Sequence, residues 1–329
     1  MRVPIRPFSA AVMVGALNLA VLVFAASAAA QNFPIRPVRL VIGFAAGGGT
    51  DVAARTVAAA LSERLGQQVV VENRGGAGGA LASELVAHAV PDGYTLLGCG
   101  IAHTLAPLLR KNLPFDTAKD FAPITATAMF ANVMVVGTAR PWRTVGELIA
   151  QAKADPGKLT YGSSGVGSTL HLSMELFKSM AGVDIVHVPY KGGSPALADV
   201  IAGHIDMTFD NIPGELGAIK GGQVRALAVS SRARNAQLPD VPTLAEAGVP
   251  GFELVGWYGL CAPAGVPEPI LDKLHADAVA VLETPSYRRS AAEQGIDPAP
   301  MTRAQYAAFL EAQAAKWAKV VRDAGVRPE

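Results

Sequence analysis

The chain of 329 residues carries 28 lysine and arginine side chains against 27 aspartate and glutamate side chains, which gives a formal net charge of +1. No basic block stands out from this balance, which excludes nucleic acid as the expected partner. Half of the residues are hydrophobic and only 17% are charged, so a chain of this length can bury a large core and form two domains.

Residues 1–30 predict a signal peptide. Arg2 and Arg6 form a basic start, an apolar stretch follows from Ala10 to Ala26, and small residues lead up to a cleavage site near Ala30. A membrane anchor is the alternative, but the stretch is short for a span of about 20 residues. We therefore expect an exported, soluble protein.

A repeated unit dominates the rest of the sequence: an apolar strand, a glycine-rich turn and then a helix. The first unit runs from Val38 to Gly66, and others begin near residues 68, 158 and 184. Each junction leaves free backbone N–H groups at the positive end of a helix. Glycine lets a ligand approach that backbone closely. Several such junctions in one chain predict helix N-termini that converge on an anion.

Alternating strands and helices favour an α/β fold with parallel layers. From Pro269 onward the pattern is mostly helical. Strands are predicted at residues 38–44, 68–72, 95–98, 133–136, 159–162, 185–189, 207–209, 226–230 and 257–262.

Two extended apolar stretches, residues 121–138 and 252–267, are interpreted as crossings between two lobes. A first lobe of residues 31–126 and 257–329 would then enclose a second lobe of residues 127–256. Hinges are expected near residues 126–132 and 253–258.

The glycine loops supply the candidate ligand donors, although each loop alone is also compatible with a simple tight turn. No GK[ST] follows the first loop, so it is not a Walker loop, and a dinucleotide fingerprint is not met. His103 follows a strand end and is a candidate for the cleft, whereas His171 is expected to pack or cap a helix. The candidates that the loops offer by themselves are Gly47, Gly48, Gly49, Thr50, Asn73, Arg74, Ser163, Ser164, Ser168, Thr169, Tyr190, Ser194 and Asp210.

Cys99 and Cys261 both lie in apolar, strand-like segments. We expect two buried free thiols, because cysteine behaves as a small hydrophobic residue. A disulfide is the alternative, because an oxidising compartment permits one. The cysteine and histidine spacing matches no zinc motif, so no metal site is expected.

The loop motifs, in this order and spacing, are similar to those of the Bug-type receptors of the tripartite tricarboxylate transporter (TctC) family. The resemblance covers almost the whole mature chain. Its clearest segments are FPIRPVRLVIGFAAGGGTDVAAR (33–55), VVENRGGAGGALAS (70–83), KLTYGSSGVGSTLHLSMELF (158–177) and VPYKGGSPALADVIAGHID (188–206).

The resemblance implies a two-lobed periplasmic-binding-protein type II fold (a "Venus flytrap") that holds a small organic carboxylate between its lobes. It implies no catalysis, no cofactor, a monomer, and membrane transporter subunits as partners. One departure is Ala45-Ala46 in the first loop, where many relatives have proline. The ligand contacts that it implies are Phe44, Gly48, Gly49, Asp51, Asn73, Gly78, Gly79, Ser164, Ser168, Thr169 and Asp210, with His103 and Thr104 helping to select the ligand.

Two other functions stay open at this point. An exported serine hydrolase would use Ser163, Ser164 or Ser168, but none of them lies in a G-x-S-x-G elbow and no base is placed beside them. A sensor would bind the same ligand and report to a signalling partner. The sequence does not separate sensing from transport, and it does not name the carboxylate.

Overall fold

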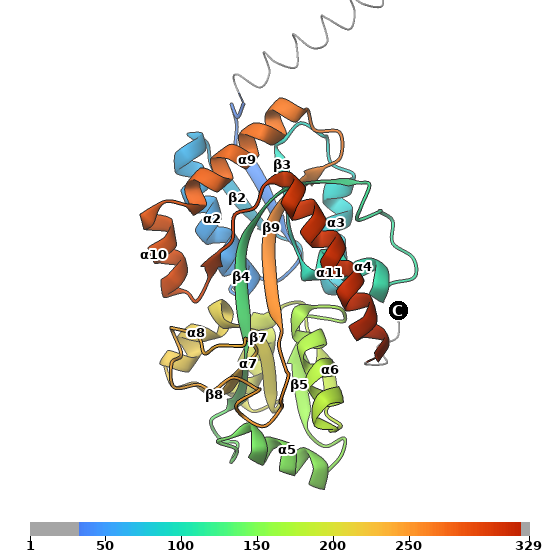
Figure 1. Ribbon diagram of the computed structural model, residues 1–329, viewed down its shortest axis with the longest axis vertical. Helices are drawn as coiled ribbons and strands as arrows, with labels where there is room; N and C mark the ends of the chain where they lie inside the picture. The colour runs from blue at the N-terminus through green and yellow to red at the C-terminus, as the bar shows by residue number, and fades with distance from the viewer. Residues whose placement is uncertain (1–32, 324–329) are drawn as a thin grey trace, which may run out of the picture.

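The computed structural model describes residues 33–323, so the predicted signal peptide lies outside the described residues. Two α/β lobes lie one above the other in Figure 1, and the long strands β4 (Phe121–Gly137) and β9 (Val255–Pro263) run between them. No helix within residues 33–323 is long and apolar enough to span a membrane.

The upper lobe is built on a sheet with the strand order β2-β1-β3-β9-β4. The first three strands are parallel, whereas β9 runs antiparallel to both β3 and β4. A two-residue strand also pairs with β4. The other strands of this lobe are β1 (Val38–Ile42), β2 (Val69–Asn73), β3 (Thr95–Gly100) and β10 (Asp297–Pro298).

The lower lobe continues from β4 in the order β7-β5-β6. These three strands are parallel to one another, and β4 pairs antiparallel with both β7 and β8. Their bounds are β5 (Thr160–Ser163), β6 (Val186–Pro189), β7 (Met207–Asn211) and β8 (Val224–Val229).

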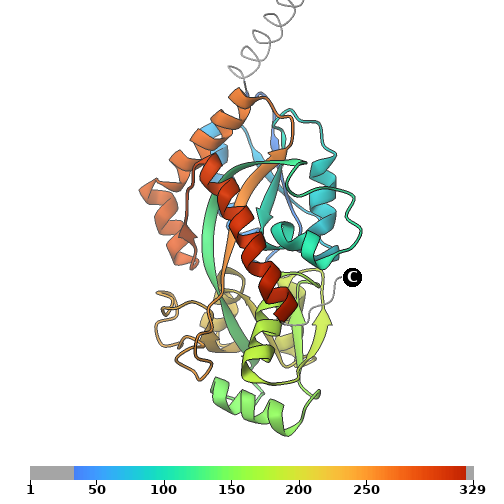
Figure 2. The ribbon, with the colours of Figure 1, turned by 45° about the vertical axis from the view of Figure 1, so that its right-hand side comes forward.

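Helices pack on the sheets of both lobes (Figure 1). In the views of Figures 1 and 2, α11 crosses the upper lobe beside α4 and ends close to the lower lobe. The upper-lobe helices are α2 (Gly49–Leu65), the short 3-10 turn η1 (Ala77–Gly79), α3 (Ala80–Ala87), α4 (Ile101–Leu109), α9 (Glu268–Leu282), α10 (Pro285–Glu293) and α11 (Arg303–Asp323). The lower-lobe helices are α5 (Val145–Ala154), α6 (Thr169–Ala181), α7 (Gly193–Ala202) and α8 (Ile212–Lys220).

Strand β4 belongs to both sheets. Its residues 121–131 pair with β9, and its residues 132–136 pair with β7. All nine predicted strands are present, but the prediction of parallel layers is wrong for β4 and β9. Antiparallel crossings let one continuous strand leave the upper sheet and enter the lower one, which a purely parallel arrangement would not allow without a helical connection.

The expectation of two free thiols is wrong, because Cys99 and Cys261 form a disulfide with a Cα–Cα distance of 5.9 Å. Cys99 lies on β3 and Cys261 on β9, and these antiparallel neighbours place Cys261 opposite Leu97, two residues from Cys99. The separation falls in the usual range for a disulfide. Only the pairing of two strands far apart in the sequence brings the two cysteines together.

Candidate ligand site between the lobes

A small cavity lies where the strand ends of the upper lobe meet the lower lobe. Three upper-lobe turns line it, together with Tyr258 from β9 and the first residue of α6. The lining residues are Gly43, Phe44, Thr50, Gly79, Ser83, Leu97, Gly98, Gly100, Ile101, Ala102, His103, Thr169 and Tyr258.

Helix N-termini surround this cavity. The N-cap residues of α2, α3 and α4 are Gly48, Gly79 and Gly100, and none of them caps its helix with a side chain. The first N–H groups of a helix have no partner within the helix, and they lie at the positive end of its dipole. The cavity therefore has the backbone chemistry of an anion site.

The turn before α3 has a backbone that only glycine adopts easily. Gly78 and Gly79 have φ angles of 60° and 98°. A Cβ at Gly79 would lie 3.4 Å from the Phe44 ring, and a Cβ at Gly78 would overlap the carbonyl oxygen of Val166 in the lower lobe. The glycines let the upper lobe approach both the cavity and the opposite lobe.

No lysine or arginine is among the lining residues. The polar side chains of the lining are Thr50, Ser83, His103, Thr169 and Tyr258. The Nδ1 atom of His103 lies 3.0 Å from Ser83 Oγ. Burial lowers the pKa of His103 to about 4, so the ring is neutral at physiological pH. Any anion in the cavity would be held by neutral donors.

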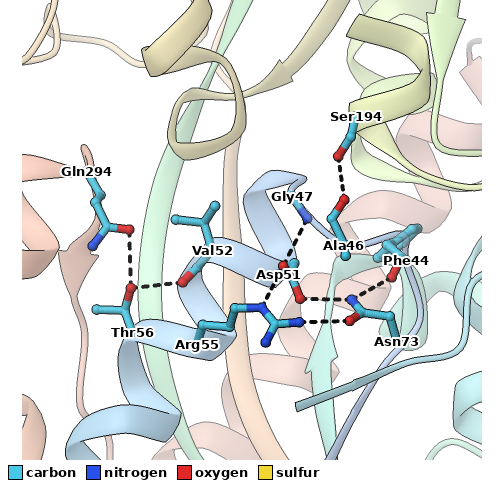
Figure 3. A network of polar contacts seen from close by, with 10 residues as sticks. All are labelled: Phe44, Ala46, Gly47, Asp51, Val52, Arg55, Thr56, Asn73, Ser194 and Gln294. Atoms are coloured by element: carbon cyan, nitrogen blue, oxygen red, sulfur yellow. Dashed lines mark hydrogen bonds and ion pairs between the residues drawn. The ribbon is translucent and has the colours of Figure 1, made fainter. Parts of the chain in front are cut away.

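Asp51 and Asn73, both predicted ligand contacts, hold the first glycine loop together (Figure 3). The Asp51 carboxylate accepts hydrogen bonds of 2.9 Å from Gly47 N, Arg55 Nε and Asn73 Nδ2. Asn73 Nδ2 also donates to the Phe44 carbonyl oxygen at 3.0 Å. Burial favours the protonated acid, but these bonds outweigh it and lower the pKa of Asp51. The network fixes the loop that leads into α2.

The same loop touches the lower lobe. Ser194 Oγ, at the start of α7, donates to the Ala46 carbonyl oxygen at 2.8 Å (Figure 3). Ala45 N donates to the Lys191 carbonyl oxygen at 3.2 Å. These contacts hold the two lobes against each other around the cavity.

Tyr258 joins three parts of the molecule at the edge of the cavity. Its hydroxyl accepts hydrogen bonds from Thr50 Oγ1 of α2 at 3.1 Å and from Asn211 Nδ2 of β7 at 2.6 Å. Burial, together with the charge of Asp210, raises the pKa of Tyr258, so the hydroxyl keeps its proton. Sequence reasoning missed Tyr258 and Ser83. A tyrosine in a buried run, which requires a polar partner, was the available signal.

Asp210 is buried, does not line the cavity, and interacts electrostatically with a second carboxyl group, that of Glu215. Its Oδ1 accepts from Asn211 N at 2.6 Å, and burial raises its pKa to about 7. Glu215, in the first turn of α8, is fully buried, and neither of its oxygens has a hydrogen-bond partner. Burial and the nearby charge of Asp210 raise the pKa of Glu215 well above its ordinary value. The pair therefore keeps at least one proton at neutral pH.

Of the predicted contacts, Phe44, Gly79, His103 and Thr169 line the cavity. The remaining candidates lie around it. Gly48 and Gly49 begin α2, Ser164 is buried after β5, and Ser168 caps α6 by accepting from His171 N at 3.3 Å. His171 Nδ1 in turn lies 3.3 Å from Gly167 N, in line with the expected packing or capping histidine.

One serine does contact a histidine. Ser163 Oγ lies 2.6 Å from His187 Nε2 and also accepts from Gly165 N at 3.0 Å. Burial lowers the pKa of His187 to about 4, so its ring is neutral and can accept a hydrogen bond from the Ser163 hydroxyl. Ser163 has no exposed surface and does not line the cavity. The pair ties β5 to β6, but it offers no hydroxyl to a substrate.

Comparisons with known proteins identify the family of the chain. The sequence model of the "Tripartite tricarboxylate transporter family receptor" matches residues 53–326. Rpa4515 of R. palustris, solved with adipate, is 39% identical with a TM-score of 0.88, over 90% of this chain and 100% of that one.

Two further solved structures are similar. The periplasmic binding protein BugD is 34% identical with a TM-score of 0.87, over 90% of this chain and 100% of that one. MatC of Rhodopseudomonas palustris, solved with bound malate, is 33% identical with a TM-score of 0.82, over 88% of this chain and 100% of that one.

Proposed function

The chain belongs to the tripartite tricarboxylate transporter family of receptors, and we propose that it is a periplasmic solute receptor that closes on a small organic carboxylate. In this proposal the lobe of residues 31–126 and 257–329 closes against the lobe of residues 127–256. The receptor then delivers its ligand to membrane subunits of a tripartite tricarboxylate-type transporter.

The observation that carries the proposal is the group of helices whose uncapped N-termini meet at one cavity. Charge-assisted hydrogen bonds contribute roughly 1.5–3 kcal/mol each. Micromolar binding needs about 8 kcal/mol in total. Four or five such bonds, discounted for ordering and desolvation, are sufficient without a lysine or arginine. The relatives solved with adipate and malate bind ligands of this class.

The test is native mass spectrometry of the purified protein, followed by a thermal-shift screen of mono-, di- and aromatic carboxylates. Ligand at one hundred times Kd stabilises the folded state by about 2.7 kcal/mol, which raises the melting temperature. The primary amides of the same acids are the matched controls, because they keep the shape and lose the charge. Amides that stabilise the protein as well as the acids do would contradict an anion site.

A variant pair locates the site within the protein. Gly79→Val places a branched side chain in the cavity lining and is expected to abolish the thermal shift. Lys191→Ala removes an exposed ammonium group close to the lobe contact and is expected to leave the shift unchanged. If Lys191→Ala abolishes binding, a salt bridge rather than a neutral cradle holds the ligand.

Delivery to a transporter requires a separate measurement. Cells that lack this receptor are expected to lose uptake of the labelled carboxylate and to regain it with the wild-type gene. Restoration of uptake should fail with Gly79→Val. Unchanged uptake without the receptor, together with a ligand-dependent signalling response, would favour the sensor instead.

A further inference from the structure

A second cavity borders the first one at His103. It lies between α4, the segment of residues 117–123 and α11. Its lining residues are His103, Thr104, Thr117, Ala118, Phe121, Pro123, Ala307, Leu310, Glu311 and Ala314. Among the described residues, His103 is the one that lines both cavities.

The His103 ring is held firmly at this boundary. Its centroid lies 4.5 Å from that of Phe121 in an edge-to-face arrangement, and 6.3 Å from that of Phe115 in a stacked one. On the other side its Nδ1 contacts Ser83 Oγ, and only 7% of the residue is exposed. Aromatic neighbours and a side-chain hydrogen bond together restrict the rotation of the ring.

We propose that His103 is the end wall of the ligand site and sets the longest carboxylate that the receptor accepts. This inference rests on the proposed function, because it takes the first cavity as the carboxylate site. A ligand whose carboxylate lies at the helix N-termini can extend only as far as the imidazole ring. Short-chain carboxylates fit in front of the ring, and longer ones require space that the ring occupies.

The chemistry of the second cavity determines what a shorter wall would admit. Its lining is mostly apolar, with Phe121, Pro123 and Leu310 supplying the larger surfaces. Glu311 is the acidic residue of the lining, so the distal end of an incoming chain meets a negative charge. Removal of the ring is therefore expected to admit long-chain monocarboxylates and to exclude dicarboxylates of the same length.

Isothermal titration calorimetry of straight-chain monocarboxylates from propanoate to dodecanoate tests the wall. The wild type is expected to bind the short acids and to lose affinity sharply at one chain length. In His103→Ala the loss should move to longer chains. Each methylene that enters the second cavity should tighten binding by about fourfold. The corresponding α,ω-dicarboxylates should not bind more tightly to His103→Ala than to the wild type.

Three further variants test whether the bulk of the His103 side chain, rather than the packing around it, sets the chain-length cut-off. His103→Phe keeps a ring of similar bulk and is expected to keep the wild-type cut-off. Leu310→Ala enlarges the second cavity without opening the wall, and it should also keep that cut-off. His103→Ser is a second opening variant that keeps a small polar side chain, for use if His103→Ala does not fold.

The outcomes separate this inference from the proposed function. If the wild type binds no carboxylate of any length, the proposed function fails. If the wild type binds short acids but the folded His103→Ala and His103→Ser variants keep its cut-off, the end-wall role is overturned. A cut-off that moves equally in His103→Phe also overturns it, because bulk is then not the cause.

Discussion

Replacing Tyr258 with phenylalanine is expected to weaken ligand binding by loosening the closed form rather than by removing bulk from the site. The hydroxyl accepts one hydrogen bond from the upper lobe, through Thr50, and one from the lower lobe, through Asn211. The ring keeps its stacking on Phe130, whose centroid lies 4.2 Å away. The substitution therefore removes a junction and little else.

The magnitude follows from the two bonds. A neutral hydrogen bond contributes a net 0.5–1.5 kcal/mol, or about 1–3 kcal/mol for the pair. In the structure, where the lobes touch each other, Asn211 is 3% exposed, so its amide is left without water when the hydroxyl is removed. In an open form both donors regain water. The closed form therefore loses about 1–3 kcal/mol relative to the open form, which corresponds to a Kd about 5–150 times higher when binding requires closure.

Calorimetry and small-angle scattering measure the two halves of this expectation. Calorimetry should report the rise in Kd, and at a ligand concentration that closes most of the wild type the radius of gyration should be larger in the variant. Saturating ligand should restore a compact profile. Tyr287→Phe is the matched control, because Tyr287 is a buried tyrosine on α10 that does not line the cavity. An unchanged Kd in Tyr258→Phe, with the same scattering profile as the wild type, would refute the reasoning.

Three further predictions concern the turn, the buried acid and the disulfide. Gly79→Val should weaken carboxylate binding at least a hundredfold in calorimetry while circular dichroism stays native-like, because valine resists a φ of 98° and lies against Phe44; a loss below tenfold would contradict this. Because the pKa of Asp210 is raised to about 7, the wild type has extra stability at low pH and loses it as the pH rises through about 7. Asp210→Asn has no such loss, so its melting temperature relative to that of the wild type should increase from pH 5 to pH 8. A decrease over this range would contradict the prediction. Reduction of the Cys99–Cys261 disulfide, or replacement of both cysteines by alanine, should lower the free energy of unfolding by about 2–4 kcal/mol and so lower the melting temperature. Ligand binding at 25 °C should stay intact, since neither cysteine lines the cavity. Loss of affinity in a folded variant would place the disulfide in the site.

Local patterns in the sequence located the strands but not their partners. Residues 38–42 and 95–100 are apolar runs bounded by glycine or polar residues, and both form strands close to the predicted bounds. The apolar stretch at 121–138 was recognised as a crossing, yet only its end was predicted as a strand. Pairing between β4 and β9, and the disulfide that follows from β3 beside β9, depends on contacts between residues more than 100 positions apart. Periodicity within a window of the sequence contains no information on such contacts.

For the candidate site, too, the sequence predicted local elements but not the contacts between them. Glycine loops before helices predicted uncapped N-termini, and Gly48 and Gly79 precede such helices at the cavity. The roles of polar side chains were harder to assign, because Asp51 and Arg55 satisfy each other within one helix turn. Donors that a loop uses for its own structure look the same in the sequence as donors that face a ligand. Tyr258 required knowledge of which strand crosses the cleft.

The geometry of the lobe contact explains why an anion would favour the closed form. Helices α2 and α8 begin against each other, since a Cβ at Gly49 would lie 2.7 Å from that of Asn211. Two positive helix ends brought together repel each other. Asp51 and Glu215 lie in the first turns of these helices, but Asp51 is neutralised by Arg55 and the raised pKa of Glu215 favours its neutral acid. A carboxylate in the cavity would place a negative charge beside the first turn of α2, because Thr50 lines the cavity, so its binding and the closure of the lobes are expected to stabilise each other.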